Sequence, residues 1–303
     1  MTEAGRHAVL VGATATGKSA LALALARADP TWELVSVDSM QVYRGMDIGT
    51  AKPTAAEQAQ VPHHLIDLID PWEDATVAWY QAEARAVLAD LETRGKRGLL
   101  VGGTGLYVQA VVDDLDIPGQ HPGVRAELEA EPDTTALHAR LRALDPVAAG
   151  RMEPGNRRRI LRALEVTLGS GRPFSSFGPG VHAHPENRFT QVGLGVEPTV
   201  LAERIAARYQ AQLAAGFLDE VRRLVEHPRG LSRTARQALG YKELIDHLDG
   251  LLTLDEAVDL AVRRTRRFAR RQRAWFRRDP RITWLDGAEP PEALVAALAA
   301  LTA

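Results

Sequence analysis

Eight residues near the start of the chain have the types and spacing of a phosphate-binding loop. The pattern is a glycine, four further residues, a second glycine, a lysine and a serine, and it reads Gly12-Ala13-Thr14-Ala15-Thr16-Gly17-Lys18-Ser19. Glycines let backbone N–H groups turn toward phosphate oxygens, and a helix that begins at the loop adds the positive end of its dipole. We expect Lys18 to neutralise the distal phosphate and the Ser19 hydroxyl to bind Mg²⁺. The motif predicts a bound di- or triphosphate without saying which.

A second group of polar residues, Asp38–Tyr43, directly follows a short apolar run. Parallel sheets bind their ligands beyond the carboxyl ends of the strands, where this segment would lie. Asp38 could accept a proton or a hydrogen bond from an amine nucleophile, and the Gln41 amide could pair with an adenine edge. The alternative is a structural role, in which Asp38 or Ser39 caps a following helical turn.

The fourth apolar run does not end in the carboxylate that a nucleotide hydrolase needs. In such enzymes a later strand ends in a carboxylate that helps to hold Mg²⁺ and water. Here the fourth apolar run ends Val101-Gly102-Gly103-Thr104, and only Asp67 and Asp70 remain as substitutes. The pattern therefore weakens the hydrolase interpretation without excluding it.

Short apolar runs alternate with helical patterns in the first hundred residues. We expect strands at 7–11, 33–37, 64–68 and 98–101, and helices at 19–27 and 77–94. This alternation predicts an α/β fold with a P-loop NTPase-like core, in which a parallel sheet is flanked by helices.

The alternation stops at about residue 121, where only helical patterns follow. These patterns cover 122–131, 134–144 and 156–168, between turns rich in proline and glycine. We predict an inserted all-helical subdomain at 121–188, within a core domain formed by 1–120 and 189–303. The core should resume with a strand at 189–196, helices at 200–213, 218–226, 242–248 and 254–277, and a last strand at 282–285.

The distribution of charge indicates a polyanionic partner. The net charge of the 303-residue chain is only −2, but residues 1–120 hold 16 acids and nine basic residues, so the remainder is basic. Nine arginines and no acid lie between Arg263 and Arg278. This run is either a solvated helix face or a contact for nucleic-acid phosphates, and we favour the second for part of it. The absence of cysteine excludes disulfides and thiolate catalysis, and no apolar segment has membrane-spanning length.

Taken together, the motifs resemble those of the bacterial tRNA dimethylallyltransferases, also called tRNA isopentenyltransferases. The resemblance runs from about Val9 to Trp284 and is specific because the whole set occurs in order. Its parts are the phosphate loop and the segments 38–43, 45–53, 62–64, 101–107, 159–166 and 235–241.

The resemblance implies transfer of a dimethylallyl group from dimethylallyl pyrophosphate to the N6 amine of the adenosine 3′-adjacent to the anticodon in tRNA. It also implies Mg²⁺ as cofactor, and we expect a cytoplasmic monomer that is not attached to a membrane. Carried over by position, Thr14 and Thr16–Ser19 cradle the pyrophosphate, and Arg236 reaches it from the opposite wall. Asp38 serves as general base or as an orienting acceptor for the adenine N6 amine, and Thr104 binds the tRNA or the pyrophosphate. The residues that would contact tRNA are Asp38, Ser39, Met40, Gln41, Thr104, Arg125, Arg158, Arg159, Ile160, Leu161 and Arg162.

Two motifs depart from the family pattern. The tRNA-contacting motif is usually Gln-Arg-Leu-x-Arg, and here it reads Arg158-Arg159-Ile160-Leu161-Arg162. Phosphate contacts through the arginines should survive, whereas the sequence leaves open whether Arg158 replaces the base contact of the usual glutamine. The phosphate loop has alanine at position 13 where proline is frequent, with little expected effect because backbone N–H groups bind the phosphate.

Three other functions fit parts of the same pattern. A P-loop small-molecule kinase would share the loop but would need no basic surface of tRNA size. An isopentenyltransferase that acts on free adenine nucleotides would not need the helical insertion or the arginine clusters. A non-catalytic RNA-binding protein would leave the loop and Asp38 without a purpose.

Overall fold

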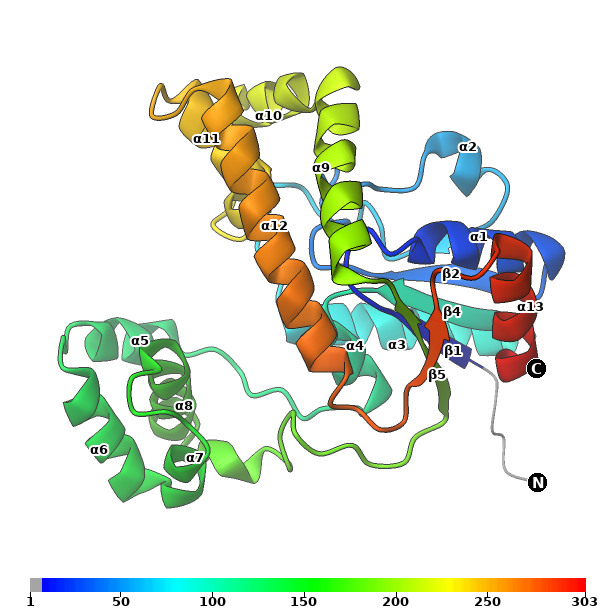
Figure 1. Cartoon of the computed structure of the whole chain (residues 1–303). Helices are drawn as coiled ribbons and strands as arrows, with labels where there is room; N and C mark the ends of the chain where they lie inside the picture. Colours follow the sequence, from blue (N-terminus) through cyan, green and yellow to red (C-terminus); the bar gives the residue numbers. More distant parts are fainter. Residues whose placement is uncertain (1–6) are drawn as a thin grey trace. The chain divides into compact units, whose positions relative to one another are not determined.

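One parallel sheet of six strands forms part of the larger of two compact units, residues 7–112 and 186–303, in the computed structural model, which describes residues 7–303 (Figure 1). The strand order is β3-β2-β4-β1-β5-β6. The strands are β1 (His7–Val11), β2 (Trp32–Val37), β3 (His63–His64), β4 (Arg97–Gly102), β5 (Phe189–Gly195) and β6 (Thr283–Asp286). Every residue of β1 and β2 is buried, as expected for parallel strands with both faces covered. The predicted α/β class with its P-loop NTPase-like core is confirmed.

Helices cover the two faces of the sheet with separate apolar clusters. On one face, α1 (Lys18–Ala28) and α13 (Pro291–Thr302) pack against side chains such as Leu10 and Leu99. On the other face, α3 (Val77–Thr93) and α4 (Gly105–Val112) pack against Val9 and Leu100 and their neighbours. Successive residues of a strand point to opposite faces, so the apolar runs supply both clusters.

The third strand is much shorter than the predicted 64–68. Leu65 and Asp67 have left-handed backbone conformations, with φ of +63° and +54°, which end the strand after His64. The chain then runs beside the segment that follows β2, where Asp67 N–H donates to Gln41 O at 3.1 Å and Leu68 N–H donates to Val42 O at 2.8 Å. These bonds tie 67–69 to the carboxyl edge of the sheet.

A group of helices extends the second apolar cluster beyond the carboxyl edge. They are α9 (Pro198–Ala214), α10 (Phe217–Glu226), η2 (Ala235–Gln237), α11 (Tyr241–Leu248) and α12 (Leu254–Phe276). The short helix α2 (Ala55–Gln58) has no buried residue and lies outside this cluster. The longest, α12, begins with a capping box in which Thr253 and Glu256 each accept the other's backbone N–H. It packs against α4, α9 and α11. No helix within residues 7–303 combines the length and apolar character that crossing a membrane requires.

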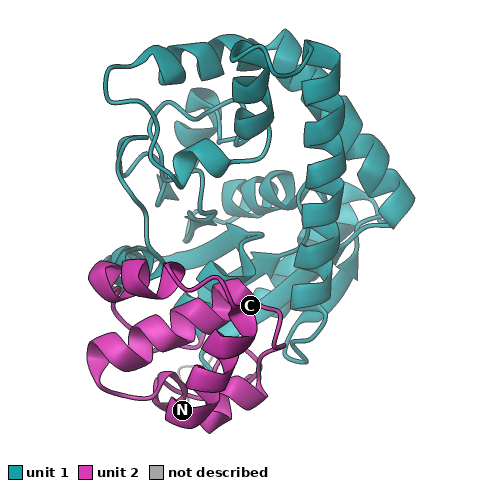
Figure 2. Cartoon of the chain, turned by 90° about the vertical axis from the view of Figure 1, so that its left-hand side faces the viewer, with its two compact units in different colours: residues 1–112, 186–303 teal, residues 113–185 magenta. Residues whose placement is uncertain are grey.

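Residues 113–185 form a second compact unit made only of helices (Figure 2). It contains α5 (Pro122–Glu129), α6 (Thr134–Leu144), α7 (Pro146–Gly150), α8 (Arg157–Ser170) and η1 (Phe174–Ser176). Its bounds differ from the predicted 121–188 because the chain before α5 already packs against α8. Pro118 O accepts a hydrogen bond from Arg162 at 2.6 Å, and His121 N–H donates to the Glu165 carboxylate at 2.9 Å.

Candidate active site

The phosphate loop joins β1 to α1, at the carboxyl edge of the sheet. Gly17 ends it with φ of +100°, a left-handed conformation that glycine adopts without steric cost, and Ala15 is also left-handed at +65°. Within the loop, Thr16 Oγ1 donates to Ala13 O at 3.0 Å and Lys18 Nζ donates to the same oxygen at 2.7 Å. The sequence motif thus forms the compact turn that anion binding requires.

Three charged groups interact at this loop: Lys18, Asp38 and Arg208. Burial lowers the pKa of Lys18 to about 8, although the Asp38 charge raises it, and the Arg208 charge lowers it further. Burial also raises the pKa of Asp38, against the hydrogen bond from Met40 N–H at 2.8 Å and the Lys18 charge. The structure therefore brings the predicted base, at the end of β2, to the predicted phosphate lysine.

Arg208, on α9, is a functional candidate that the sequence did not reveal. Its guanidinium donates to Thr14 Oγ1 at 2.9 Å, and one turn earlier Arg204 donates to Thr16 O at 3.3 Å. Burial lowers the pKa of Arg208, and Nε has no hydrogen-bond partner among residues 7–303. A half-buried cation with unused hydrogen-bonding capacity at a phosphate loop is suited to an anionic ligand. The i, i+4 spacing of the two arginines was the only sequence signal.

Arg236, the predicted second cation, is not brought to the loop by any bond in the described part of the chain. It lies in η2, its side chain is 52% exposed, and it pairs with Asp249 at 3.5 Å. Its proposed contact with pyrophosphate therefore remains a prediction, whereas Arg208 already contacts the loop.

A turn after β4 connects the phosphate loop with the region of Asp38. Thr104 Oγ1 accepts a hydrogen bond from Ser39 N–H at 3.4 Å. Gln272, on the buried side of α12, accepts from Thr14 N–H and donates to Gly103 O, both at 2.8 Å. Gln272 was also missed, because nothing in the sequence distinguishes it within the arginine run.

The segment after Asp38 is half-buried and Gln41 supports a neighbouring loop. Gln41 Oε1 accepts from Ser36 Oγ at 2.7 Å, and Nε2 donates to Thr50 O and Ala51 O, both at 3.2 Å. The amide that was expected to meet adenine is thus engaged with the protein. Ser39 and Met40 remain half-buried beside Asp38, as a base-pocket lining requires.

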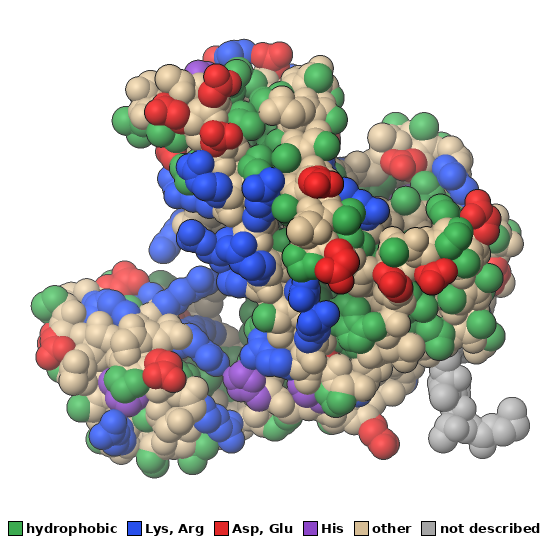
Figure 3. Space-filling model, in the orientation of Figure 1, with side chains coloured by type: hydrophobic (Ala, Val, Ile, Leu, Met, Phe, Trp, Pro, Cys, Tyr) green, Lys and Arg blue, Asp and Glu red, His purple; other side chains and the backbone are tan. Residues whose placement is uncertain are grey.

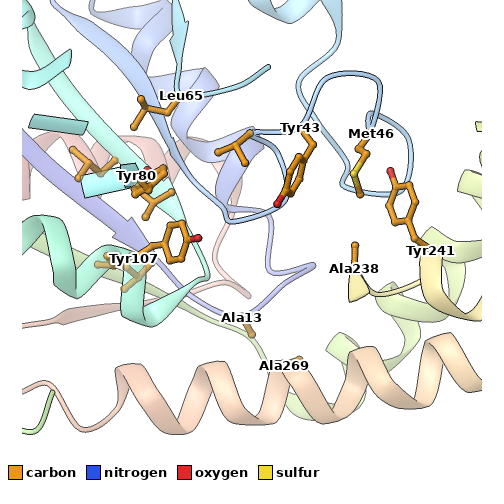
Figure 4. Packing of buried hydrophobic residues seen from close by; sticks show 14 of the residues in the cluster. Ala13, Tyr43, Met46, Leu65, Tyr80, Tyr107, Ala238, Tyr241 and Ala269 are labelled. Carbon is orange, nitrogen blue, oxygen red and sulfur yellow. The ribbon is translucent and has the colours of Figure 1, made fainter. Parts of the chain in front are cut away.

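Two tyrosines lie close enough to Asp38 for its charge to affect them. Burial raises the pKa of Tyr107 to about 12 and that of Tyr80 well above its usual value, and the Asp38 carboxylate adds to both shifts. Their ring centroids are 4.7 Å apart, within the apolar cluster that also includes Ala13 and Tyr43 (Figure 4). The Tyr80 hydroxyl donates to Ser36 O at 2.6 Å. Asp38 therefore lies beside a buried aromatic surface.

In the helical unit, only part of the predicted tRNA motif faces solvent. Arg158 and Arg159 are exposed at the start of α8. Ile160 and Leu161 are 0% and 3% exposed in the core of that unit, so the expectation that they contact tRNA is wrong. Helical periodicity turns both toward the neighbouring helices. Arg125 and Arg162 are half-buried and pair with Glu165, at 3.8 and 2.8 Å.

The arginine run lies on α12 and the two residues that follow it. Its exposed members are on one side of the helix, and the opposite side is buried. Lys and Arg side chains gather over this helix in Figure 3. We call the exposed set the arginine face; its members are Arg263, Arg267, Arg270, Arg271, Arg277 and Arg278. The opposite side is buried and includes Thr265, Ala269 and Phe276. The arginine face can bind phosphates while the other side packs on the core.

Ser19 is the only protein group that we assign to a metal. It is exposed in the first turn of α1. Within residues 7–303 no three His, Asp or Glu side chains lie together as metal ligands. Mg²⁺ bound to a phosphate substrate commonly takes one protein oxygen, substrate oxygens and water, so a single serine hydroxyl fits this ion.

Family models and curated relatives place this chain among known proteins. The family model described as IPP transferase matches residues 41–279, and the one described as isopentenyl transferase matches residues 6–68. A tRNA dimethylallyltransferase from Salinispora arenicola is 51% identical, with 94% of this chain and 83% of that protein covered. One from Kineococcus radiotolerans is also 51% identical, with coverage of 93% and 92%.

Solved structures give the same result. The tRNA isopentenylpyrophosphate transferase of Bacillus halodurans is similar over 98% of this chain and 97% of that chain, with 38% identity and a TM-score of 0.71. A eukaryotic dimethylallyltransferase acting on tRNA is similar over 93% of this chain and 74% of that chain, with 25% identity and a TM-score of 0.77. This chain, with its phosphate loop joined to Asp38 at the edge of a parallel sheet, belongs to the tRNA dimethylallyltransferase family.

Proposed function

We propose that this protein transfers the dimethylallyl group of dimethylallyl pyrophosphate to N6 of the adenosine 3′-adjacent to the anticodon in tRNA, and releases pyrophosphate. The observation that carries the proposal is the shared site of two cations, the buried Lys18 and the half-buried Arg208, and the half-buried carboxylate of Asp38. A monomer is proposed as the active form. A tRNA substrate supports a cytoplasmic location.

Lys18 and Arg208 act on the leaving group. The C1–O bond of the allylic diphosphate breaks with its electron pair on oxygen, so negative charge grows on the pyrophosphate. Cations held in a dry site stabilise that charge more than cations in water do. The backbone N–H groups of the loop, from Ala15 to Ser19, add dipoles directed at the same anion.

Asp38 acts on the nucleophile. The N6 lone pair forms the new N–C1 bond, and the nitrogen then loses one proton, which Asp38 accepts. Burial raises the pKa of this carboxyl, so it is a stronger base than an exposed aspartate. To reach it, the adenosine must leave its stack, which costs a few kcal/mol and less in a flexible loop.

Mg²⁺ is proposed as the cofactor at the Ser19 hydroxyl, where it would add positive charge to the diphosphate oxygens. The exposed position of Ser19 leaves room for the ion and its water ligands.

Two surfaces are proposed to bind tRNA phosphates. One is the arginine face of α12, and the other is the exposed pair Arg158 and Arg159 on α8. Arginine contacts of this kind hold the nucleic acid without reading its sequence.

The alternatives are separated by one assay, in which the protein is incubated with labelled dimethylallyl pyrophosphate, ATP, and either unmodified tRNA or AMP. Label should enter tRNA alone. Label in AMP but not in tRNA would indicate an enzyme of free nucleotides, and phosphate transfer from ATP would indicate a kinase. Binding of tRNA without transfer would indicate a non-catalytic protein.

The role of Asp38 is tested with Asp38→Asn, which preserves shape and removes the base. We expect kcat to fall by about 10²- to 10⁴-fold, the usual contribution of a general base. The Kd for tRNA should stay unchanged because the arginine surfaces are intact. An equal loss of tRNA binding would contradict this role.

A further inference from the structure

Gln272 is buried between the phosphate loop and the turn after β4. Its side chain is on α12, and the residue is 7% exposed. Its two bonds to backbone, described above, fix the distance between the phosphate loop at Thr14 and the turn after β4 at Gly103.

Two glycines in the turn after β4 allow α12 to approach closely. A Cβ added to Gly103 would lie 2.3 Å from Gln272 Nε2, and one added to Gly105 would lie 2.4 Å from the ring of Trp275, one turn away on α12. Both distances are far inside van der Waals contact, so only glycine lets the helix approach so closely. The close approach of α12 therefore explains Gly103 and Gly105.

The contacts of Gln272 continue to the catalytic base. Gly103 is followed by Thr104, whose hydroxyl accepts the N–H of Ser39, the residue after Asp38. One side chain thus links the loop that holds the leaving group to the segment that holds the base. Bond formation at C1 needs the amine and the diphosphate in line, and an error of about 1 Å in such an arrangement can cost about 10²-fold in rate.

We propose that Gln272 is a positioning residue that sets the alignment of the diphosphate with the nucleophilic amine. The proposal rests on the proposed transferase function. Gln272 commits the Thr14 N–H to the protein, so this group is not among the donors to the diphosphate. Removing the amide frees that N–H, so diphosphate binding is kept or strengthened while transfer slows.

The first test is Gln272→Leu, which keeps side-chain volume and removes both hydrogen bonds. We expect kcat to fall by about 10- to 100-fold at saturating tRNA and dimethylallyl pyrophosphate. The Kd for inorganic pyrophosphate, measured by calorimetry, should stay within about threefold or tighten, because the lost interaction acts on alignment rather than on ground-state binding.

Gln212→Leu is the matched control. Gln212 is also 7% exposed and bonds only to backbone, through Nε2 to Ile48 O at 2.6 Å and Gly49 O at 3.3 Å, but neither bond touches the loop or the turn. It should lose comparable Tm with a much smaller loss of kcat. Equal losses of kcat at equal Tm would show that Gln272 is merely structural.

Gln272→Glu gives a second readout that does not depend on the leucine variant folding. A protonated glutamic acid can accept from Thr14 N–H and donate to Gly103 O, whereas the ionised form has no donor for that oxygen. The ratio of variant to wild-type kcat should therefore rise as the pH falls, and this ratio removes ionisations common to both.

A flat ratio would overturn the proposal, as would Gln272→Leu with wild-type kcat or with pyrophosphate affinity falling in step with kcat. If the wild type transfers no dimethylallyl group to tRNA, the proposed function fails instead. The two failures are distinguished by the wild-type assay alone.

Discussion

Replacement of Arg208 by glutamine is the most direct test of how the site stabilises its leaving group. The exchange removes a full charge from a half-buried position and keeps a polar side chain. For two unit charges about 4 Å apart at an effective dielectric constant of about 20, the interaction is about 4 kcal/mol. Removal of one preorganised donor from an enzyme typically costs about 10²- to 10³-fold in rate, which is about 3–4 kcal/mol. The two estimates agree.

We therefore expect kcat/KM for dimethylallyl pyrophosphate, measured at saturating tRNA, to fall by about 10²- to 10³-fold in Arg208→Gln. The comparison variant is Arg236→Gln, the same exchange at a side chain that is 52% exposed and paired with Asp249. If Arg236 does not reach the pyrophosphate, kcat/KM in this variant should change by less than about threefold, as is usual for an exposed ion pair. The Tm of Arg208→Gln should not fall, because Nε of the wild-type cation is buried and unpartnered among residues 7–303. Wild-type activity in Arg208→Gln together with a large loss in Arg236→Gln would refute the reasoning and restore Arg236 as the pyrophosphate ligand.

Two further predictions concern pH and salt. The pKa of Lys18 is lowered from 10.5 to about 8, so the protonated form that binds diphosphate is lost as the pH rises through that value, and the Kd for inorganic pyrophosphate should increase there. Lys18→Arg keeps its charge in this range, so its Kd should not show this alkaline increase; an identical increase would place the ionisation elsewhere. On the acid side, kcat/KM should fall at a higher pH than an ordinary aspartate would give, because burial raises the pKa of Asp38. Arg158→Ala with Arg159→Ala should weaken tRNA binding at every sequence and reduce the slope of log Kd against log salt by about one per lost phosphate contact, whereas an unchanged slope would remove α8 from the interface.

The pH behaviour of Lys18 has a counterpart in stability. Its pKa is lower in the folded chain than in the unfolded chain, so the unfolded state binds more protons between pH 8 and 10.5. The free energy of unfolding should gain from Lys18 as the pH rises through this interval. Below pH 8 its burial destabilises the fold, a cost that the bound diphosphate offsets.

The loop, the sheet and Asp38 could be predicted because each is encoded locally. A short motif fixes the turn before Lys18, and an apolar run fixes β2 and hence the edge at which Asp38 lies. The rule that parallel strands end at one edge then places the two together. The third strand was overestimated because nothing in an apolar side chain such as that of Leu65 indicates a left-handed conformation.

Arg208 and Gln272 could not be predicted because their importance depends on packing between elements far apart in sequence. Each is one polar residue in a long helix, and only the docking of α9 and α12 on the loop selects it. The assignment of Ile160 and Leu161 failed for a different reason, since a linear motif was carried over whole. The helical spacing of the apolar residues in 156–168 already indicated that both belong to a core.

The bond between Thr14 and Gln272 joins positions 258 residues apart. During synthesis, the phosphate loop therefore emerges from the ribosome long before α12, the helix that carries Gln272. A polypeptide that ends before α12 retains the whole phosphate-loop motif. It lacks the hydrogen bond between Thr14 and Gln272. In a truncated homologue or a gene fragment, presence of the motif is therefore no sign of a working transferase, and integrity of the C-terminal region is the better criterion.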